Sequence, residues 1–295
     1  RLPAAVYHFH DPELIPWAWL LLLRRAPVVY DVHEDYAVAV AHKQYLPAWL
    51  RRRLGRLVDV AERALTRPFR IVIAEDCYAS RFPQGLRVRN YPPRSLLSVG
   101  PAFDARSRRL LYTGNVTEER GALNLAGVAA VASDLRITLV GRCSPALASR
   151  MRAIAGDAGA SRMTIIGEGR YVPFSEIRAR YAEGDWLCGT ALFPDSPHYR
   201  EKALTKFFEY MAAGLPVIAS DVPFWRRLIV EQGLGICVDS TDPRAAVQAA
   251  RRFAEDPAEA REMGRRGREL VRRHYNWEYQ GAALVAFYRS LLRTV

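Results

Sequence analysis

The chain has 295 residues, half of them hydrophobic, which is enough for two domains with packed cores and excludes a disordered protein. Its 43 basic and 31 acidic side chains give a net charge of +12, which indicates an anionic partner without choosing among nucleic acid, lipid headgroups and sugar nucleotides. The four cysteines are scattered and form no C-x-x-C pair, which argues against a disulfide or zinc framework and favours a cytoplasmic protein with reduced cysteines.

The first predicted elements are a strand and a short apolar helix. Residues 4–9 predict a strand that ends before Pro12. Residues 14–23 are almost all apolar, but a membrane span needs ~20 such residues, so we expect a buried helix that begins at Pro16. Two tryptophans in this segment and the arginine pair behind it leave contact with a membrane interface as the alternative.

Histidines and acids follow both of the first two predicted strands. The second strand spans residues 28–30, and the four side chains are His10, Asp11, His33 and Glu34. Because a crossover helix joins the strands, we expect them to be parallel and to place these side chains at one edge of the sheet. Their atoms suit a metal ion, but their spacing matches no compact zinc motif, so we expect no metal. A ligand site is favoured over separate structural histidines.

Residues 37–70 predict basic helical structure with apolar residues between the charges. The common interpretation is an amphipathic helix with a solvated face. The alternative is docking on anionic lipid headgroups, where each nearby Lys or Arg contributes ~1 kcal/mol, through Arg51, Arg52, Arg53 and Arg56. Nucleic acid ranks third, because no RNP, KH or zinc-finger pattern accompanies the charge.

The rest of the chain predicts a second α/β domain. Residues 71–74 form one more strand of the first domain, and residues 92–107 contain three prolines, as expected of a linker. Six strands then alternate with helices, which is typical of a doubly wound parallel sheet; they span residues 110–113, 137–140, 163–166, 186–192, 216–219 and 235–238. We expect domains at residues 1–100 and 101–275, with a last helix at 276–295.

The most informative stretch is EKALTKFFEYMAAGLPVIASD, residues 201–221. Thr205 predicts a helix start, and Gly214 followed by Pro216 predicts its end before a buried strand. Lys206 lies in the first turn, where the helix dipole disfavours a cation unless a phosphate binds there. Glu209 could accept hydrogen bonds from the two hydroxyls of a ribose. The alternative is that both charges are solvated.

This stretch resembles the donor-site motif of the retaining GT-B glycosyltransferases, in particular family 4 of the bacterial polysaccharide-assembly type. Two glutamates separated by seven residues precede a small-residue turn in that family, as Glu201 and Glu209 do here, although Pro-Phe-Gly is absent after Glu201. HFHDP and DVHE likewise resemble its acceptor-side wall. The resemblance implies two Rossmann-like, doubly wound domains facing across a cleft. It also implies that the first domain is incomplete, with its earliest strands and a glycine loop upstream of Arg1.

The resemblance also implies residue roles. The family's phosphate-binding loop matches residues 114–121, with Arg120 in place of its lysine and Asn115 in place of its arginine. Lys206 is the expected replacement cation, with Arg142 and Arg200 as the alternatives. The implied catalytic residues are His10, Arg120 and Lys206. The implied donor-binding residues are Gly114, Asn115, Arg120, Tyr171, Val172, Glu201, Thr205, Lys206 and Glu209, with Glu209 on the ribose. The implied acceptor-binding residues are His10, Asp11, His33 and Glu34.

The function expected from this resemblance is transfer of a sugar, with retention, from a nucleotide-diphosphate sugar to a saccharide or lipid-linked saccharide. No metal or cofactor is expected, and no Asp-x-Asp pair is present to hold a metal. The expected location is the cytoplasm, with peripheral contact at the inner face of the plasma membrane. The alternatives are a non-catalytic sugar-nucleotide-binding module, a sugar-nucleotide epimerase and a nucleic-acid-binding protein.

Overall fold

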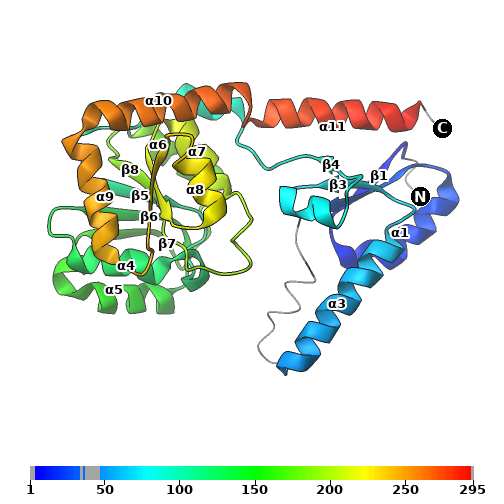
Figure 1. The fold of residues 1–295 in the computed structure, drawn as a ribbon, viewed down its shortest axis with the longest axis horizontal. Coiled ribbons are helices and arrows are strands. Elements are labelled where there is room, and N and C mark those ends of the chain that lie inside the picture. Colours follow the sequence, from blue (N-terminus) through cyan, green and yellow to red (C-terminus); the bar gives the residue numbers. More distant parts are fainter. Residues whose placement is uncertain (1–3, 34–35, 37–46, 294–295) are drawn as a thin grey trace. The chain divides into compact units, whose positions relative to one another are not determined.

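The computed structural model describes residues 4–33, 36 and 47–293, without the side chains of Ala48, Arg51 and Arg52. Glu34 and most of residues 37–47 therefore lie outside the described part. The chain forms two compact units, which are shown in Figure 1. The first comprises Arg1–Asn90 together with Trp277–Val295, and the second comprises Tyr91–Asn276.

The first unit contains a parallel four-stranded sheet in the order β1-β2-β3-β4. Its strands are β1 (Tyr7–Phe9), β2 (Val28–Val32), β3 (Arg70–Ile73) and β4 (Leu86–Arg87). Its helices are η1 (Pro12–Leu14), α1 (Ile15–Leu21), η2 (Leu22–Arg24), α3 (Ala48–Leu65), η3 (Asp76–Ser80) and α11 (Trp277–Leu292). The parallel pairing of β1 with β2 confirms that the two predicted strand ends lie at the same edge.

Strand alternation divides the core of the first unit between two faces of its sheet. Tyr30 and Val32 of β2 pack with Phe9 and Ile71 on one face. Val29 packs on the other face with Val72 and Leu291, so α11 covers that side.

The expectation of a buried helix at residues 14–23 is wrong. Only Ile15 and Ala18 of α1 are buried, whereas Trp17 is 68% exposed and Leu23 is 81% exposed. A helix of seven residues that packs along one stripe leaves its other side chains in solvent, whatever their polarity. No described helix is both long enough and apolar enough to cross a membrane.

The second unit contains a six-stranded sheet in the order β10-β9-β8-β5-β6-β7, with every pair parallel. Its strands are β5 (Arg109–Thr113), β6 (Arg136–Cys143), β7 (Met163–Glu168), β8 (Cys188–Ala191), β9 (Val217–Ser220) and β10 (Gly235–Val238). Its helices, which surround the sheet in Figure 1, are η4 (Arg94–Val99), η5 (Glu118–Arg120), α4 (Ala122–Val131), α5 (Pro145–Ala160), α6 (Phe174–Ala182), α7 (Thr205–Ala213), α8 (Pro223–Ile229), α9 (Pro243–Glu255) and α10 (Pro257–Arg273).

This strand order confirms the predicted doubly wound sheet and shows where its direction reverses. The chain runs outward from β5 through β6 to β7, and then returns to place β8 on the other side of β5. The carboxyl ends of β5 and β8 therefore flank the topological switch point, where open α/β sheets bind ligands.

Helix α7 ends as its sequence predicts but begins differently. Gly214 takes the left-handed conformation at the C-terminus (φ 69°), and β9 follows. The expectation that the Thr205 side chain caps the N-terminus is wrong, because Leu204 occupies the cap and no side chain bonds there. Thr205 is already the first helical residue, so its hydroxyl faces solvent instead of the free backbone N–H groups.

Two glycines of the second unit are expected to respond oppositely to alanine. A Cβ on Gly189 would lie 2.4 Å from the Tyr210 ring, so Gly189→Ala should destabilise the fold by roughly 1–3 kcal/mol. Gly127 lies within α4, and its added Cβ would meet Pro243 at 3.7 Å. Gly127→Ala should therefore stabilise by about 0.4–1 kcal/mol. Urea denaturation of both variants checks this, and equal shifts would contradict the packing of β8 on α7.

Candidate functional site

The first candidate site lies at the switch point of the six-stranded sheet. Gly114 directly follows β5, with φ 97°, and its backbone N–H donates to the Val140 carbonyl at 2.9 Å. Phe193 follows β8 on the other side. The chain therefore turns sharply at the edge where a ligand is expected, and the residue at that turn has no side chain to block it.

Lys206 projects into this region from the first turn of α7. Its Nζ lies 3.7 Å from the centroid of the Tyr112 ring and 4.7 Å from that of Phe193. The residue is only 7% exposed, and among the described residues its ammonium has no hydrogen-bond partner. Cation–π attraction contributes at most about 2 kcal/mol and satisfies none of its N–H donors.

The surroundings of Lys206 disfavour its positive charge. Burial lowers the pKa of Lys206 well below its ordinary value, and the positive charge of Arg120 lowers it further. Glu209 opposes this shift only in part. The protein therefore holds a cation where its own groups do not compensate it, which is the arrangement expected of an anion site before the anion binds.

Glu209 lies one turn beyond Lys206 and is held by a tyrosine from α6. Its Oε2 accepts a hydrogen bond from the Tyr181 hydroxyl at 3.0 Å, and that hydroxyl lies 2.9 Å from Thr113 Oγ1. Burial raises the pKa of Glu209, while Tyr181 and Lys206 act in the opposite direction. One face of α7 thus presents an oriented carboxylate next to a buried ammonium.

The structure gathers some of the predicted donor residues and leaves others apart. Gly114, Arg120, Lys206 and Glu209 meet at the switch point. The remaining predicted donor residues lie apart from this group in the described part of the chain: the side chains of Asn115, Tyr171, Glu201 and Thr205 are exposed, and Val172 is buried against Gly167.

A second cluster lies in the first unit, at the carboxyl ends of β1 and β2. His8 Nε2 and His33 Nε2 each lie 3.1 Å from Asp31 Oδ2, and His10 Nδ1 lies 3.5 Å from the same oxygen. Of the predicted acceptor residues, His10 and His33 therefore meet, whereas Asp11 is exposed and its side chain forms no cap bond. Glu34 lies outside the described residues.

The electrostatics of this cluster favour an ionised Asp31. Burial alone would raise the pKa of Asp31, but hydrogen bonds from His33 and His8 outweigh burial and lower the pKa to about 2. Burial lowers the pKa of His10, with only partial opposition from Asp31. The cluster opens into a cavity of about 300 Å³, which Trp277, Leu284 and Tyr288 of α11 also line.

Comparisons with known proteins find similarity to glycosyltransferases. Residues 146–286 match a protein-family model described as "Glycosyl transferase-like", a range that includes α7. The chain is 23% identical over 297 aligned positions to a phosphatidyl-myo-inositol mannosyltransferase of Mycobacterium leprae, covering 97% of the chain and 73% of that protein. It is 27% identical over 136 residues, 45% of the chain and 35% of the relative, to the lipopolysaccharide core mannosyltransferase LpsB of Rhizobium meliloti.

Solved structures give the same result for the fold. Sucrose-phosphate synthase of Thermosynechococcus elongatus superimposes with a TM-score of 0.73 at 22% identity, over 99% of this chain and 74% of that one. HepE of Anabaena in complex with UDP has a TM-score of 0.70 at 11% identity, over 96% and 79% of the two chains. The chain therefore has the GT-B fold, and it is similar to glycosyltransferases in sequence.

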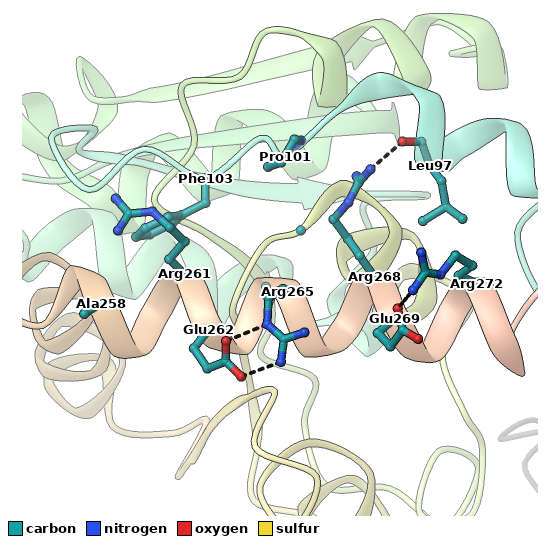
Figure 2. Close-up of a pocket in the computed structure, with 12 residues that line it drawn as sticks. Leu97, Pro101, Phe103, Ala258, Arg261, Glu262, Arg265, Arg268, Glu269 and Arg272 are labelled. Atoms are coloured by element: carbon teal, nitrogen blue, oxygen red, sulfur yellow. Dashed lines mark hydrogen bonds and ion pairs between the residues drawn. The ribbon is translucent and has the colours of Figure 1, made fainter.

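A pocket of the second unit is a different feature, formed by α10 and residues 97–103 (Figure 2). Its volume is about 790 Å³, but most of its charges are already satisfied. Arg268 donates to the carbonyls of Leu97, Gly100 and Ala212, and Arg265 pairs with Glu262. These bonds attach α10 to the unit, so the pocket lacks the uncompensated charge of the switch-point site.

Sequence reasoning missed the partners that complete both clusters. Asp31 and His8 were present in the D-x-H and H-x-H patterns, but only the pairing of Phe9 with Tyr30 shows that these residues converge. Tyr112 looked like an ordinary core residue of β5. Tyr181 lies on a separate helix, α6, and no sequence spacing relates it to Glu209.

Replacing Lys206 by Met is expected to stabilise the unliganded protein at neutral pH, by roughly 1–3 kcal/mol, because an unpartnered buried ammonium is removed. In the wild type this penalty is complete below the lowered pKa of Lys206. It disappears as the pH rises from that value towards 10.5, because the folded state loses its proton before the unfolded state does. Wild-type stability relative to Lys206→Met should therefore rise with pH, as measured by urea denaturation. A constant difference would contradict the charged, unpartnered lysine.

Proposed function

We propose that this protein transfers a sugar from a nucleoside diphosphate sugar with retention of configuration and without a metal ion, as a family 4 enzyme of bacterial cell-surface polysaccharide or glycolipid assembly. The observation that carries the proposal is the buried, unpartnered ammonium of Lys206 at the switch point. A diphosphate would supply the acceptor oxygens that this group lacks, at a helix N-terminus that itself favours anions.

The same groups would promote the reaction. As the bond to the sugar breaks, negative charge grows on the departing diphosphate, and fixed positive charge at that position lowers the barrier. Lys206, Arg120 and the N-terminus of α7 supply such charge without reorganisation, which is the physical basis for proposing metal-independent transfer. Gly114 leaves the backbone of the first turn accessible to the phosphates.

Glu209 is assigned to the ribose of the donor. Its carboxylate is oriented by Tyr181, and a carboxylate can accept hydrogen bonds from two neighbouring hydroxyls at once. The UDP complex of the structurally similar HepE supports a nucleoside diphosphate as the ligand class. We assign the nucleobase to the loop containing Tyr171 and Val172, and secondary donor contacts to Asn115, Glu201 and Thr205.

The acceptor is assigned to the first unit, where His10 and His33 line a cavity. Asp11 and Glu34 are included from the sequence resemblance. The relatives' names refer to phosphatidyl-myo-inositol and to a lipopolysaccharide core, which supports a lipid-linked saccharide as the acceptor class. His10 would contact the transferring sugar or the acceptor hydroxyl.

Membrane contact is proposed for the face of the first unit formed by α1, η2 and α3. Trp17, Leu20 and Leu23 are more than half exposed, and Trp49 of α3 is 62% exposed. Trp19 Nε1 donates to the Leu65 carbonyl and thereby connects α1 to the end of α3. Exposed Arg53 and Arg56, with Arg51 and Arg52 beside them in the sequence, would contact anionic headgroups at the inner face of the plasma membrane.

Replacing Lys206 or Glu209, the two charged residues of α7, should weaken donor binding. Loss of a hydrogen bond to a charged group costs about 1.5–3 kcal/mol, so Lys206→Met and Glu209→Gln should weaken binding roughly 10–150-fold. Calorimetric titration with UDP, GDP, ADP and dTDP checks this. Lys202→Met and Glu231→Gln, which alter charges outside the site, are the matched controls.

Activity measurements then separate the enzyme from a non-catalytic binding module. The wild type should release the nucleoside diphosphate from one donor class without added metal and with chelator present, and NMR should show retained anomeric configuration in the product. Donor binding without turnover would support the binding module instead. Equal binding by all four variants would remove the assigned site altogether.

The proposed membrane surface predicts a loss of vesicle binding on removal of its apolar side chains. The double variant Trp17→Ser/Leu20→Ser should bind vesicles containing anionic lipid at least roughly tenfold more weakly, because it loses more than 1.4 kcal/mol of apolar burial. Co-sedimentation measures this, with Ile154→Ser, an exposed apolar residue of the second unit, as the control. Identical binding by the two variants would rule out this face.

A further inference from the structure

The histidine cluster of the first unit has a donor set beyond what acceptor binding requires. Three imidazole nitrogens, from His8, His10 and His33, surround one carboxylate oxygen of Asp31. The relevant atoms of His8, His10 and Asp31 all lie within 4.8 Å of one another. A site that combines imidazole and carboxylate ligands binds Zn²⁺ and similar transition metals in preference to Mg²⁺ or Ca²⁺.

The distances also match metal coordination. Zinc bonds of about 2.0–2.1 Å in a tetrahedral site separate neighbouring ligand atoms by about 3.3 Å. The three nitrogens lie 3.1, 3.5 and 3.1 Å from Asp31 Oδ2, close to that spacing. The second oxygen, Oδ1, is buried and has no partner among the described residues, so the carboxylate retains bonding capacity.

One outer contact supports the same geometry. His8 presents Nε2 to Asp31, while its other nitrogen, Nδ1, lies 2.5 Å from the Tyr288 hydroxyl on α11. Metal-binding histidines commonly donate their second N–H to such a partner, which sets the ring orientation. Tyr288 would perform this function for His8.

We propose that His8, His10 and Asp31 bind one divalent transition-metal ion of the Zn²⁺ class, with His33 beside Asp31 as a partner of that carboxylate. Metal is not part of the transfer reaction. Because the ion would fix the His10 ring beside Asp31 at the edge of the cavity, bound metal inhibits transfer, a consequence that rests on the acceptor role proposed for His10.

Cobalt titration of the metal-free chain tests this site directly, because Co²⁺ in a four-coordinate site absorbs visible light. The wild type should bind one Co²⁺, which Zn²⁺ displaces, without the near-ultraviolet charge-transfer absorption of cysteine ligands. His8→Gln and Asp31→Asn should each lower the affinity by more than the roughly 10–100-fold that loss of an outer partner costs. His274→Gln, an exposed histidine outside the cluster, is the matched control.

The metal titration tests the metal site, and inhibition of transfer by Zn²⁺ tests the acceptor role of His10. Failure of the wild type to bind Co²⁺ more tightly than His8→Gln, or thiolate absorption, would overturn the proposal. Near-ultraviolet circular dichroism verifies that the variants fold, and the wild-type titration decides the question even if one does not. Zn²⁺ should inhibit transfer by the wild type and not by His8→Gln. If metal binds without inhibiting transfer, the metal site is supported and the acceptor role proposed for His10 is contradicted.

Discussion

The proposed donor site depends on the cost of burying the Lys206 ammonium without an acceptor. The helix N-terminus and Arg120 both raise that cost, and among the described residues Glu209 and the faces of two aromatic rings offset it in part. The buried side chains of α7 fix the helix and thereby hold Lys206 in place. A phosphate that binds there gains the interactions which the protein leaves unsatisfied.

The two units bury charges of opposite sign at equivalent places, the carboxyl ends of parallel strands. The second unit concentrates uncompensated positive charge, which suits a diphosphate. The first surrounds one buried carboxylate with three imidazoles. A cation is therefore the ligand proposed for the first cluster and an anion the ligand proposed for the second, although both clusters lie where parallel sheets commonly bind ligands.

Much of the fold could be predicted from patterns of neighbouring residues in the sequence. Alternating strands and helices predicted the doubly wound sheet, and Gly214 before Pro216 predicted the end of α7. Errors arose where the outcome depends on neighbours. The apolar segment at residues 14–23 is mostly exposed because the sheet covers only one stripe of α1, and Thr205 misses the cap by one residue. Residue identity determines neither the area that a neighbouring element covers nor the residue at which a helix begins.

The sequence by itself determined the fold class and the charged residues of α7, because hydrophobic periodicity and the G-x-P turn act over a few residues. It also predicted that the side chains following the first two strands lie at one edge of the sheet, because a crossover helix makes the strands parallel. Only the tertiary structure decided that these side chains converge, because strand register places His10 beside Asp31. It alone also placed Tyr181 on Glu209 and Tyr112 beneath Lys206, since those contacts join segments whose separation in the sequence carries no periodic signal.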